Sequence, residues 1–442
     1  MLSKTSLLSL LLPVASAAVS SPASTPSAQS KPCQLLSTNT TQPYNGNQTQ
    51  PLDPTGPTNQ TQPGNGTDLP PDDTWVPTCK LPRTDVTYSV GHGFPGDCVP
   101  GTGTIQGFMI FVDFSDAESP DFETPGELRD LLVPEAAEWY KNASYGQLEL
   151  NITADVSKFY RMPNSAESYN WEAGFSNAQH YAYVEDALDA YMNNGENPPP
   201  AATDVLYIAT TRYNEWMSRS LGSGFSAWTR DFTFVAKRAV TFGNDPYLNW
   251  GYKAVNHETG HTMCLPDYYP GSSDLPTGYY TGGWSIMGSV GGMAPDFFAW
   301  DKWRLGWLAD DAIDCILEHG TTEHTLTPLE VEGGVKAVVI AASQTSAIVA
   351  EARTAQGVDD QMCAPGVLLY TVDTTLTTSE GSVRVLDANP GSDGCGNNPW
   401  EPLDDGTLSM SGKRSFEASG WGVTVTLVDD KNGEFKIQVE YS

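Results

Sequence analysis

Positively charged residues are scarce in this chain of 442 residues. It contains 23 lysines and arginines against 54 aspartates and glutamates, which gives a formal net charge of −31 at pH 7. An acidic surface repels the phosphates of nucleic acids and the headgroups of anionic membranes. We therefore expect neither nucleic acid nor a membrane surface as a partner.

Long hydrophobic runs are also lacking. One short apolar run, residues 7–14, follows Lys4 and precedes the small residues Ala15, Ser16 and Ala17. The run is too short to span a bilayer. A basic start, a short apolar core and small residues at the end are typical of a secretory signal peptide. We expect residues 1–17 to be a signal peptide and the mature chain to be soluble, secreted and extracellular.

Large apolar side chains are rare in residues 18–84, which are rich in Pro, Thr, Gln, Asn, Gly and Ser. Such a segment buries too little surface to offset the entropy of ordering it. We expect a low-complexity, glycosylated tail or a part of a propeptide. Six Asn-x-Ser/Thr sequences predict glycosylation: Asn39, Asn47, Asn59, Asn65, Asn142 and Asn151.

Cysteines are few and odd in number, seven in all. A secreted chain normally pairs its cysteines, so at least one lacks an intramolecular partner. Nearness in sequence favours two disulfides, Cys79–Cys98 and Cys363–Cys395, and leaves Cys264–Cys315 as a third. Cys33 is then the unpaired residue.

Histidine is scarcer still, with only six residues, yet two of them form the motif His257-Glu258-Thr259-Gly260-His261. Residues i and i+4 lie on one face of a helix, so both imidazoles can reach one metal ion. Glu258 lies beside the first ligand, where it can reach a metal-bound water without being a ligand itself. Asp267, six residues past His261, can complete a site for one zinc ion.

The stretch from His257 to Trp307 resembles the immune-inhibitor-A-type secreted metalloproteases, a metzincin-like family. The matching residues are His257, Glu258, His261, Leu265 to Asp267, Tyr269, Gly283 to Gly288 and Ala299 to Trp307. The resemblance covers roughly residues 85–440 and is weaker after residue 309. It implies that Met287 lies in a tight Met-turn, with its thioether as an apolar floor under the metal.

One residue departs from the family pattern. The family usually has glycine where this chain has Cys264, because a left-handed residue ends the zinc helix there. A residue with a side chain is less stable in that conformation by roughly 1–2 kcal/mol. A second interpretation places Cys264 near the metal or in a disulfide.

The fold class that we expect is α/β (α+β), in two parts. Residues 85–309 are a metzincin-like zinc protease domain with a mixed sheet and a zinc helix, and residues 310–442 are a β-sandwich-like accessory domain. The first part has predicted strands at 105–114, 148–159, 205–209 and 232–242, and helices at 126–140, 178–192 and 295–308. The resemblance implies that an edge strand pairs with the bound peptide, and 232–242 is one candidate.

The expected function is that of a secreted zinc-dependent endopeptidase acting on protein or peptide substrates. Zinc acidifies a water whose proton Glu258 takes as general base. Tyr268 or Tyr269 could donate a hydrogen bond to the oxyanion. Two alternatives remain: a zinc exopeptidase, whose third ligand is often a glutamate on a later helix, and a secreted zinc-containing binding or adhesion protein without turnover.

Two further hypotheses concern metals. The acidic pairs Asp359-Asp360 and Asp404-Asp405 could bind Ca²⁺, although solvated charges are the simpler interpretation. Cys79 lies just before the expected protease domain, and a thiolate there could occupy the fourth position of the zinc and keep the enzyme latent. A structural disulfide is the alternative. The sequence gives neither the peptide specificity nor the oligomeric state.

Overall fold

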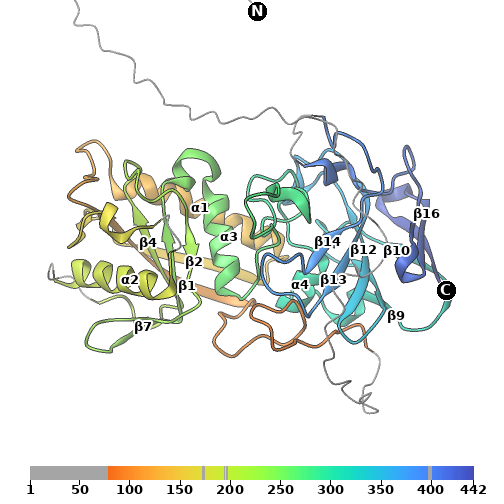
Figure 1. Ribbon diagram of the computed structural model, residues 1–442, viewed down its shortest axis with the longest axis horizontal. Helices are drawn as coiled ribbons and strands as arrows, with labels where there is room; N and C mark the ends of the chain where they lie inside the picture. Colours follow the sequence, from red (N-terminus) through yellow and green to blue (C-terminus); the bar gives the residue numbers. More distant parts are fainter. Residues whose placement is uncertain (1–77, 172–174, 194, 196–197, 397–400) are drawn as a thin grey trace, which may run out of the picture. The chain divides into compact units, whose positions relative to one another are not determined.

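The computed structural model describes residues 78–171, 175–193, 195, 198–396 and 401–442. All of them belong to one compact unit of the chain, Gln50–Ser442. They form a mixed α/β structure with several sheets and few helices (Figure 1). The predicted signal peptide, Cys33 and four of the glycosylation sites (Asn39, Asn47, Asn59, Asn65) lie outside the described residues.

The first sheet has the strand order β2-β1-β4-β8-β5, and β3 pairs with β1. Its strands are β1 (Gly103–Asp113), β2 (Leu148–Ala154), β3 (Tyr160–Arg161), β4 (Val205–Thr210), β5 (Leu221–Gly222) and β8 (Arg238–Phe242). β5 alone is antiparallel to its neighbour in the sheet. β4 and the part of β1 from Gly107 onward are buried throughout and mostly apolar, as expected for central strands that are covered on both faces.

Helices cover the two faces of this sheet. Side chains of α1 (Pro125–Ala143) and α3 (Tyr252–Thr262) share a core with Met109 and Phe111 of β1. Side chains of α2 (Asn177–Met192) pack with the alternate residues of β1, such as Ile110. Figure 1 shows α2 on the other side of the sheet from α1 and α3.

Sequence features that start helices are present at α1 and α2. Thr124 and Glu127 form a capping box at the first helix, and Ser176 and Gln179 form one at the second. Each pair satisfies backbone N–H groups that would otherwise lack partners. The predicted helices at 126–140 and 178–192 are therefore correct to within a few residues.

The predicted edge strand at 232–242 is wrong. The segment divides into β7 (Phe234–Ala236), which pairs with β6 (Ala227–Trp228), and β8. β8 is an interior strand because it pairs with β4 on one side and β5 on the other. The edge next to β8 is the short strand β5, whose two residues gave too weak a pattern to be recognised in the sequence.

The last third of the chain contains two more sheets. One has the order β14-β13-β12-β11-β9 and the other β10-β17-β16-β15. Their strands are β9 (Ile313–Ile316), β10 (Gly320–Leu326), β11 (Ala337–Ala341), β12 (Ser346–Arg353), β13 (Gly366–Asp373), β14 (Val383–Val385), β15 (Ser415–Ala418), β16 (Val423–Asp429) and β17 (Phe435–Tyr441). Residues of both sheets, such as Ile348 and Val425, share one apolar cluster. This is a two-layered packing of sheets.

The other face of the five-stranded sheet packs on the first part of the chain. Val349 and Tyr370 belong to the same core as Val255 of α3 and Trp300 of α4 (Ala299–Leu305). The backbone N–H groups of Ala299 and Trp300 donate to Glu351 of β12 and to Tyr370 of β13. The C-terminal sheets therefore hold α4 in place. α4 is shorter than the predicted helix at 295–308, because Gly306 is left-handed and ends it.

A buried ion cluster joins these layers. The guanidinium of Arg353 contacts the carboxylates of Glu330, Glu351 and Asp359, and all four side chains are fully buried. Asp359 is therefore paired with Arg353, which it shares with two other carboxylates. The Ca²⁺ hypothesis for Asp359-Asp360 stays a prediction.

Three disulfides are present among the described residues: Cys79–Cys315, Cys98–Cys264 and Cys363–Cys395. The last was predicted correctly. The predicted pairs Cys79–Cys98 and Cys264–Cys315 are wrong, because the partners in the fold lie 236 and 166 residues apart in sequence, where nearness is no guide. Since Cys79 is bonded to Cys315, its thiolate is not available to block a metal site, and the latency hypothesis is wrong for this state of the protein.

Two surface features complete the description. Asn142 and Asn151 have exposed side chains, so both sequons of the described region are accessible. Within the described ranges, no helix is long and apolar enough to cross a membrane.

Candidate metal centre

Two of the candidate ligands, His257 and His261, lie on α3, and the turn that ends this helix leads to the third, Asp267. After Thr262 the chain reverses through Cys264, which has a positive φ of 67°. The N–H of Cys264 donates to His261 and the N–H of Leu265 donates to Gly260, the two hydrogen bonds of a Schellman motif. The left-handed turn expected at this position therefore forms with cysteine, which also makes a disulfide to Cys98.

Both histidines are held in one orientation by backbone carbonyls. Nδ1 of His257 lies 2.8 Å from the carbonyl oxygen of Ile286, and Nδ1 of His261 lies 2.8 Å from that of Leu265. A carbonyl accepts only, so each Nδ1 carries the proton and each Nε2 presents a lone pair. This is the tautomer that binds a metal through Nε2.

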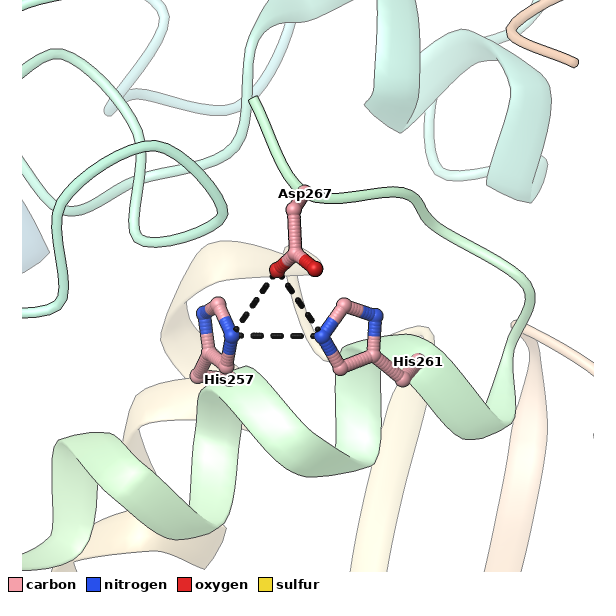
Figure 2. Close-up of side chains that lie close together, drawn as sticks. All are labelled: His257, His261 and Asp267. Atoms are coloured by element: carbon pink, nitrogen blue, oxygen red, sulfur yellow. Dashed lines mark hydrogen bonds and ion pairs between the residues drawn. The ribbon is translucent and has the colours of Figure 1, made fainter. Parts of the chain in front are cut away.

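The three predicted ligands converge (Figure 2). Oδ1 of Asp267 lies 3.3 Å from Nε2 of His257 and 3.1 Å from Nε2 of His261, and the two Nε2 atoms are 3.2 Å apart. Zinc with ligands at about 2.0–2.2 Å in tetrahedral geometry separates its ligand atoms by roughly 3.3–3.5 Å. The triangle of acceptor atoms, with sides of 3.1–3.3 Å, is thus close to the size that zinc requires and slightly smaller.

The donor set also has the right charge for a cation. Oδ1 of Asp267 is buried between the two Nε2 atoms, and within the described residues it has no donor unless one of these nitrogens is protonated. Burial opposes ionisation of this carboxyl, but the two histidines outweigh it and lower its pKa. Burial likewise lowers the pKa of His261, whereas the Asp267 carboxylate overcomes this effect and raises it to about 9. Without a metal, the site therefore holds a proton that zinc would displace.

The C-terminal region fixes the position of Asp267. The N–H of Asp267 donates to the hydroxyl of Thr378, and its carbonyl accepts from the N–H of Ser379. Tyr269 stacks on His257 with ring centroids 6.2 Å apart. Burial, followed by the charges of Asp267 and Glu258, raises the pKa of its hydroxyl, which hydrogen-bonds to Asp267. Tyr269 thus supports a ligand directly.

Met287, the residue that the resemblance places in a Met-turn, lies against α3. It is fully buried, and a Cβ on Gly260 would lie only 2.7 Å from its sulfur. Gly260 is the residue before His261, so the thioether packs closely against the turn of α3 that carries both histidines. The segment that contains Met287 makes two further contacts. The carbonyl of Ile286 accepts from His257, and the carbonyl of Met287 accepts from the N–H of Tyr268.

Glu258 is almost fully buried beside this triangle. Burial raises the pKa of its carboxyl, the two histidines oppose the rise, and the backbone N–H of Gly222 donates to it. A Cβ on Gly222 would lie 2.9 Å from the carbonyl oxygen of Glu258 and 2.9 Å from Cβ of His261. Strand β5 therefore lies directly against the face of α3 that carries Glu258 and His261.

A cavity of about 190 Å³ connects these groups. Its lining includes Glu258 and the three candidate ligands, together with Tyr88, Leu221, Tyr269 and Thr378. Tyr88 was not identified from the sequence. Its φ of 58° is unusual for tyrosine. Buried side chains hold the next three residues in place: Arg304 donates to the backbone carbonyls of Ser89 and Gly91, and Trp300 donates to that of Val90. No local sequence pattern could have placed it here.

Tyr268 does not belong to the cavity. Its hydroxyl is fully buried and donates to the carboxylate of Asp301 on α4, 2.7 Å away. The hypothesis that Tyr268 is an oxyanion donor is therefore wrong, because consecutive residues point to opposite sides of this extended segment. Tyr269 remains the candidate of the pair.

Comparison with known proteins adds nothing to this geometry. No model of a known protein family matches the chain, and no curated protein shows significant similarity to it.

Proposed function

We propose that this protein is a zinc-dependent endopeptidase of the metzincin-like class, secreted from the cell. The observation that carries the proposal is the convergence of three lone-pair donors, Nε2 of His257, Nε2 of His261 and Oδ1 of Asp267, at tetrahedral spacing. Three such acceptors within 3.3 Å repel one another unless a cation or a proton lies between them. The family resemblance and the fit of the ligands favour zinc.

His257, His261 and Asp267, which line the cavity, would hold the metal. Bound zinc supplies Lewis-acid chemistry, since it acidifies water and polarises a carbonyl. Glu258 takes the proton of the attacking water and passes it to the leaving nitrogen. Its burial favours the protonated form after the first step, which suits a group that must return the proton.

Strand β5 supports the assignment of a peptide as substrate. It is the last strand of its sheet and lines the cavity through Leu221 and Gly222. An edge strand binds an extended peptide through main-chain hydrogen bonds, whatever its side chains are. This mode of binding suits cleavage within a chain, as in an endopeptidase.

The test compares the full chain with its Glu258→Gln and His261→Ala variants, and with Glu138→Gln as an exposed control. We measure zinc by elemental analysis and the hydrolysis of an unfolded protein such as reduced casein. Wild type and control should bind one zinc and cleave. Glu258→Gln should keep zinc and lose 10²–10⁴-fold in turnover, and His261→Ala should lose both.

Two outcomes would contradict the proposal. Equal turnover in wild type and Glu258→Gln would remove the general base. Stoichiometric zinc without cleavage, even after removal of the residues before Thr78, would instead indicate a zinc-containing binding protein.

A further inference from the structure

Two buried carboxylates lie in contact on the other side of the 284–288 turn, outside the metal centre. Glu401 is 7% exposed and Asp404, in the short helix η6 (Pro402–Asp405), is 4% exposed. A Cβ on Gly283 would lie 2.8 Å from Oε2 of Glu401 and 3.1 Å from Oδ1 of Asp404. The two oxygens therefore converge at one point of the backbone.

The hydrogen bonds of this pair leave one oxygen without a partner. Glu401 accepts through Oε1 from the hydroxyl of Ser289, and Asp404 accepts through Oδ1 from the N–H of Gly283. Oε2 of Glu401 is buried and receives no fixed donor from the described residues; the carboxyls of Glu401 and Asp404 can hydrogen-bond only by sharing a proton. An unpartnered carboxylate oxygen that faces a second carboxylate is highly unfavourable in a buried site.

The surrounding charges make the imbalance larger. Burial is the main cause that raises the pKa of Asp404 and of Asp387. The nearby charge of Asp405 raises both pKa values further. Lys413 acts on Asp387, but no Lys or Arg of the described region forms an ion pair with Glu401 or Asp404. One shared proton would neutralise one charge of this group, whereas a divalent cation neutralises two.

We propose that Glu401 and Asp404 bind a divalent cation of the calcium type, which clamps η6 to the turn under the metal centre. Calcium prefers carboxylate and other oxygen ligands, and this pair offers only oxygen. Glycines make room for the carboxylates: a Cβ on Gly278 would lie 2.8 Å from Cγ of Glu401, and one on Gly282 would lie 3.0 Å from Oδ1 of Asp404. This explains why the segment before the turn is rich in glycine.

The clamp has a structural consequence. Gly283 and Ser289, which hydrogen-bond to the two carboxylates, flank the turn that contains Ile286 and Met287. Nε1 of Trp284 also donates to the carbonyl of Leu403. The cation thus stabilises the segment that orients His257 and packs under α3. The proposal does not depend on whether the centre above it is catalytic.

The experiment uses the full chain, freed of divalent cations and resupplied with zinc so that the first site stays constant. Calcium binding is measured by equilibrium dialysis, and thermal unfolding is recorded with calcium, with magnesium and with neither. Wild type should bind one additional calcium and gain a few degrees in Tm with calcium. Asp360→Asn, which removes an exposed carboxylate of the other acidic pair, should behave as wild type.

Glu401→Gln and Asp404→Asn should lose the calcium-dependent shift. In calcium-free buffer Glu401→Gln should be more stable than wild type. The new amide can donate a hydrogen bond to the carboxylate of Asp404, whereas the wild-type carboxylate of Glu401 repels it. If one of these variants fails to fold, the other variant still tests the site. Calcium binding to the wild type, measured by dialysis, is a further independent readout.

Either of two results would overturn the proposal. In the first, the wild-type Tm does not respond to calcium, and the stability of the wild type falls as pH rises while that of Asp404→Asn does not. This result would identify a shared proton in place of the cation. The second is calcium binding that both variants retain.

Discussion

The backbone N–H of Gly222, on the edge strand β5, hydrogen-bonds to the carboxylate of Glu258 on α3. Through this contact, the strand proposed to bind the substrate also positions the proposed base. The approach is so close that a side chain has no room, since a Cβ on Gly222 would meet backbone and Cβ atoms of α3 at 2.9 Å.

Gly222→Ala should therefore displace β5 from α3. We expect a 10- to 100-fold loss in turnover and a destabilisation of about 1–3 kcal/mol, because backbone atoms must move to admit one methyl group. Gly96→Ala is the matched control, since nothing lies within 4 Å of its added Cβ. Casein hydrolysis and urea unfolding provide the measurements, and unchanged turnover in Gly222→Ala would show that the strand is not coupled to Glu258.

Removal of the Cys98–Cys264 disulfide should weaken zinc binding as well as stability. The double variant Cys98→Ala/Cys264→Ala should lose about 2–5 kcal/mol, since the bond closes a long loop. The double variant Cys98→Ala/Cys264→Gly should be more stable than the alanine double variant by roughly 1 kcal/mol, because residue 264 has a positive φ.

Zinc affinity distinguishes this disulfide from the others. The Leu265 carbonyl that orients His261 follows Cys264 directly, so zinc affinity should fall in both double variants. Loss of Cys79–Cys315, where Sγ of Cys79 lies against the carbonyl of Val339 in β11, should lower stability and leave zinc affinity unchanged. Competition with a zinc-binding dye measures the affinities, and equal values in all variants would contradict the assigned role.

Arg353→Met should be among the most destabilising substitutions. It leaves Glu330, Glu351 and Asp359 as buried carboxylates without their common cation. The expected loss is about 3–5 kcal/mol in urea unfolding. Arg414→Met, at an exposed position, should change stability by less than about 0.5 kcal/mol. Near-equal stabilities would mean that the cluster is not needed to hold the layers together.

In calcium-free buffer, stability should fall as pH rises towards 7. Burial and the Glu401 charge raise the pKa of Asp404 to about 7, from an ordinary value of 3.8. The folded state then binds a proton that the unfolded state has lost, so the contribution is full below about pH 4 and is lost as pH passes 7. The difference amounts to about 4 kcal/mol at most.

Urea unfolding between pH 5.5 and 7.5 checks this pH dependence. Asp404→Asn should show a flatter profile, and calcium should reverse the slope in wild type because it binds the ionised pair. A slope that is the same in wild type and Asp404→Asn would assign the pH dependence to other groups.

Local sequence was enough to predict much of the first part of the chain. The helices at 126–140 and 178–192 were predicted from apolar spacing, and the structure adds the capping boxes that begin them. The ligand triangle was predicted because His257 and His261 are one helical turn apart and Asp267 follows within a short reversal. Spacing within a few residues limits the geometry so strongly that little else is needed.

Contacts between distant segments could not be predicted in this way. Cys264 was assigned the wrong partner, β5 was overlooked, and Tyr88 was not expected near the metal centre. The disulfide and the position of Tyr88 depend on the packing of segments more than a hundred residues apart, and local patterns carry no signal for such contacts. Strand β5 pairs with the nearby β8 but has only two residues, too few for a pattern.

The sequence alone thus determined the donor atoms: two imidazoles and a carboxylate at helical and turn spacing, with a glutamate beside them. Only the tertiary structure decided their surroundings. It brought Ile286 to His257, Gly222 to Glu258 and Thr378 to Asp267. The physical reason is that ligand spacing follows from local backbone geometry, whereas burial and orientation follow from which distant surfaces pack together.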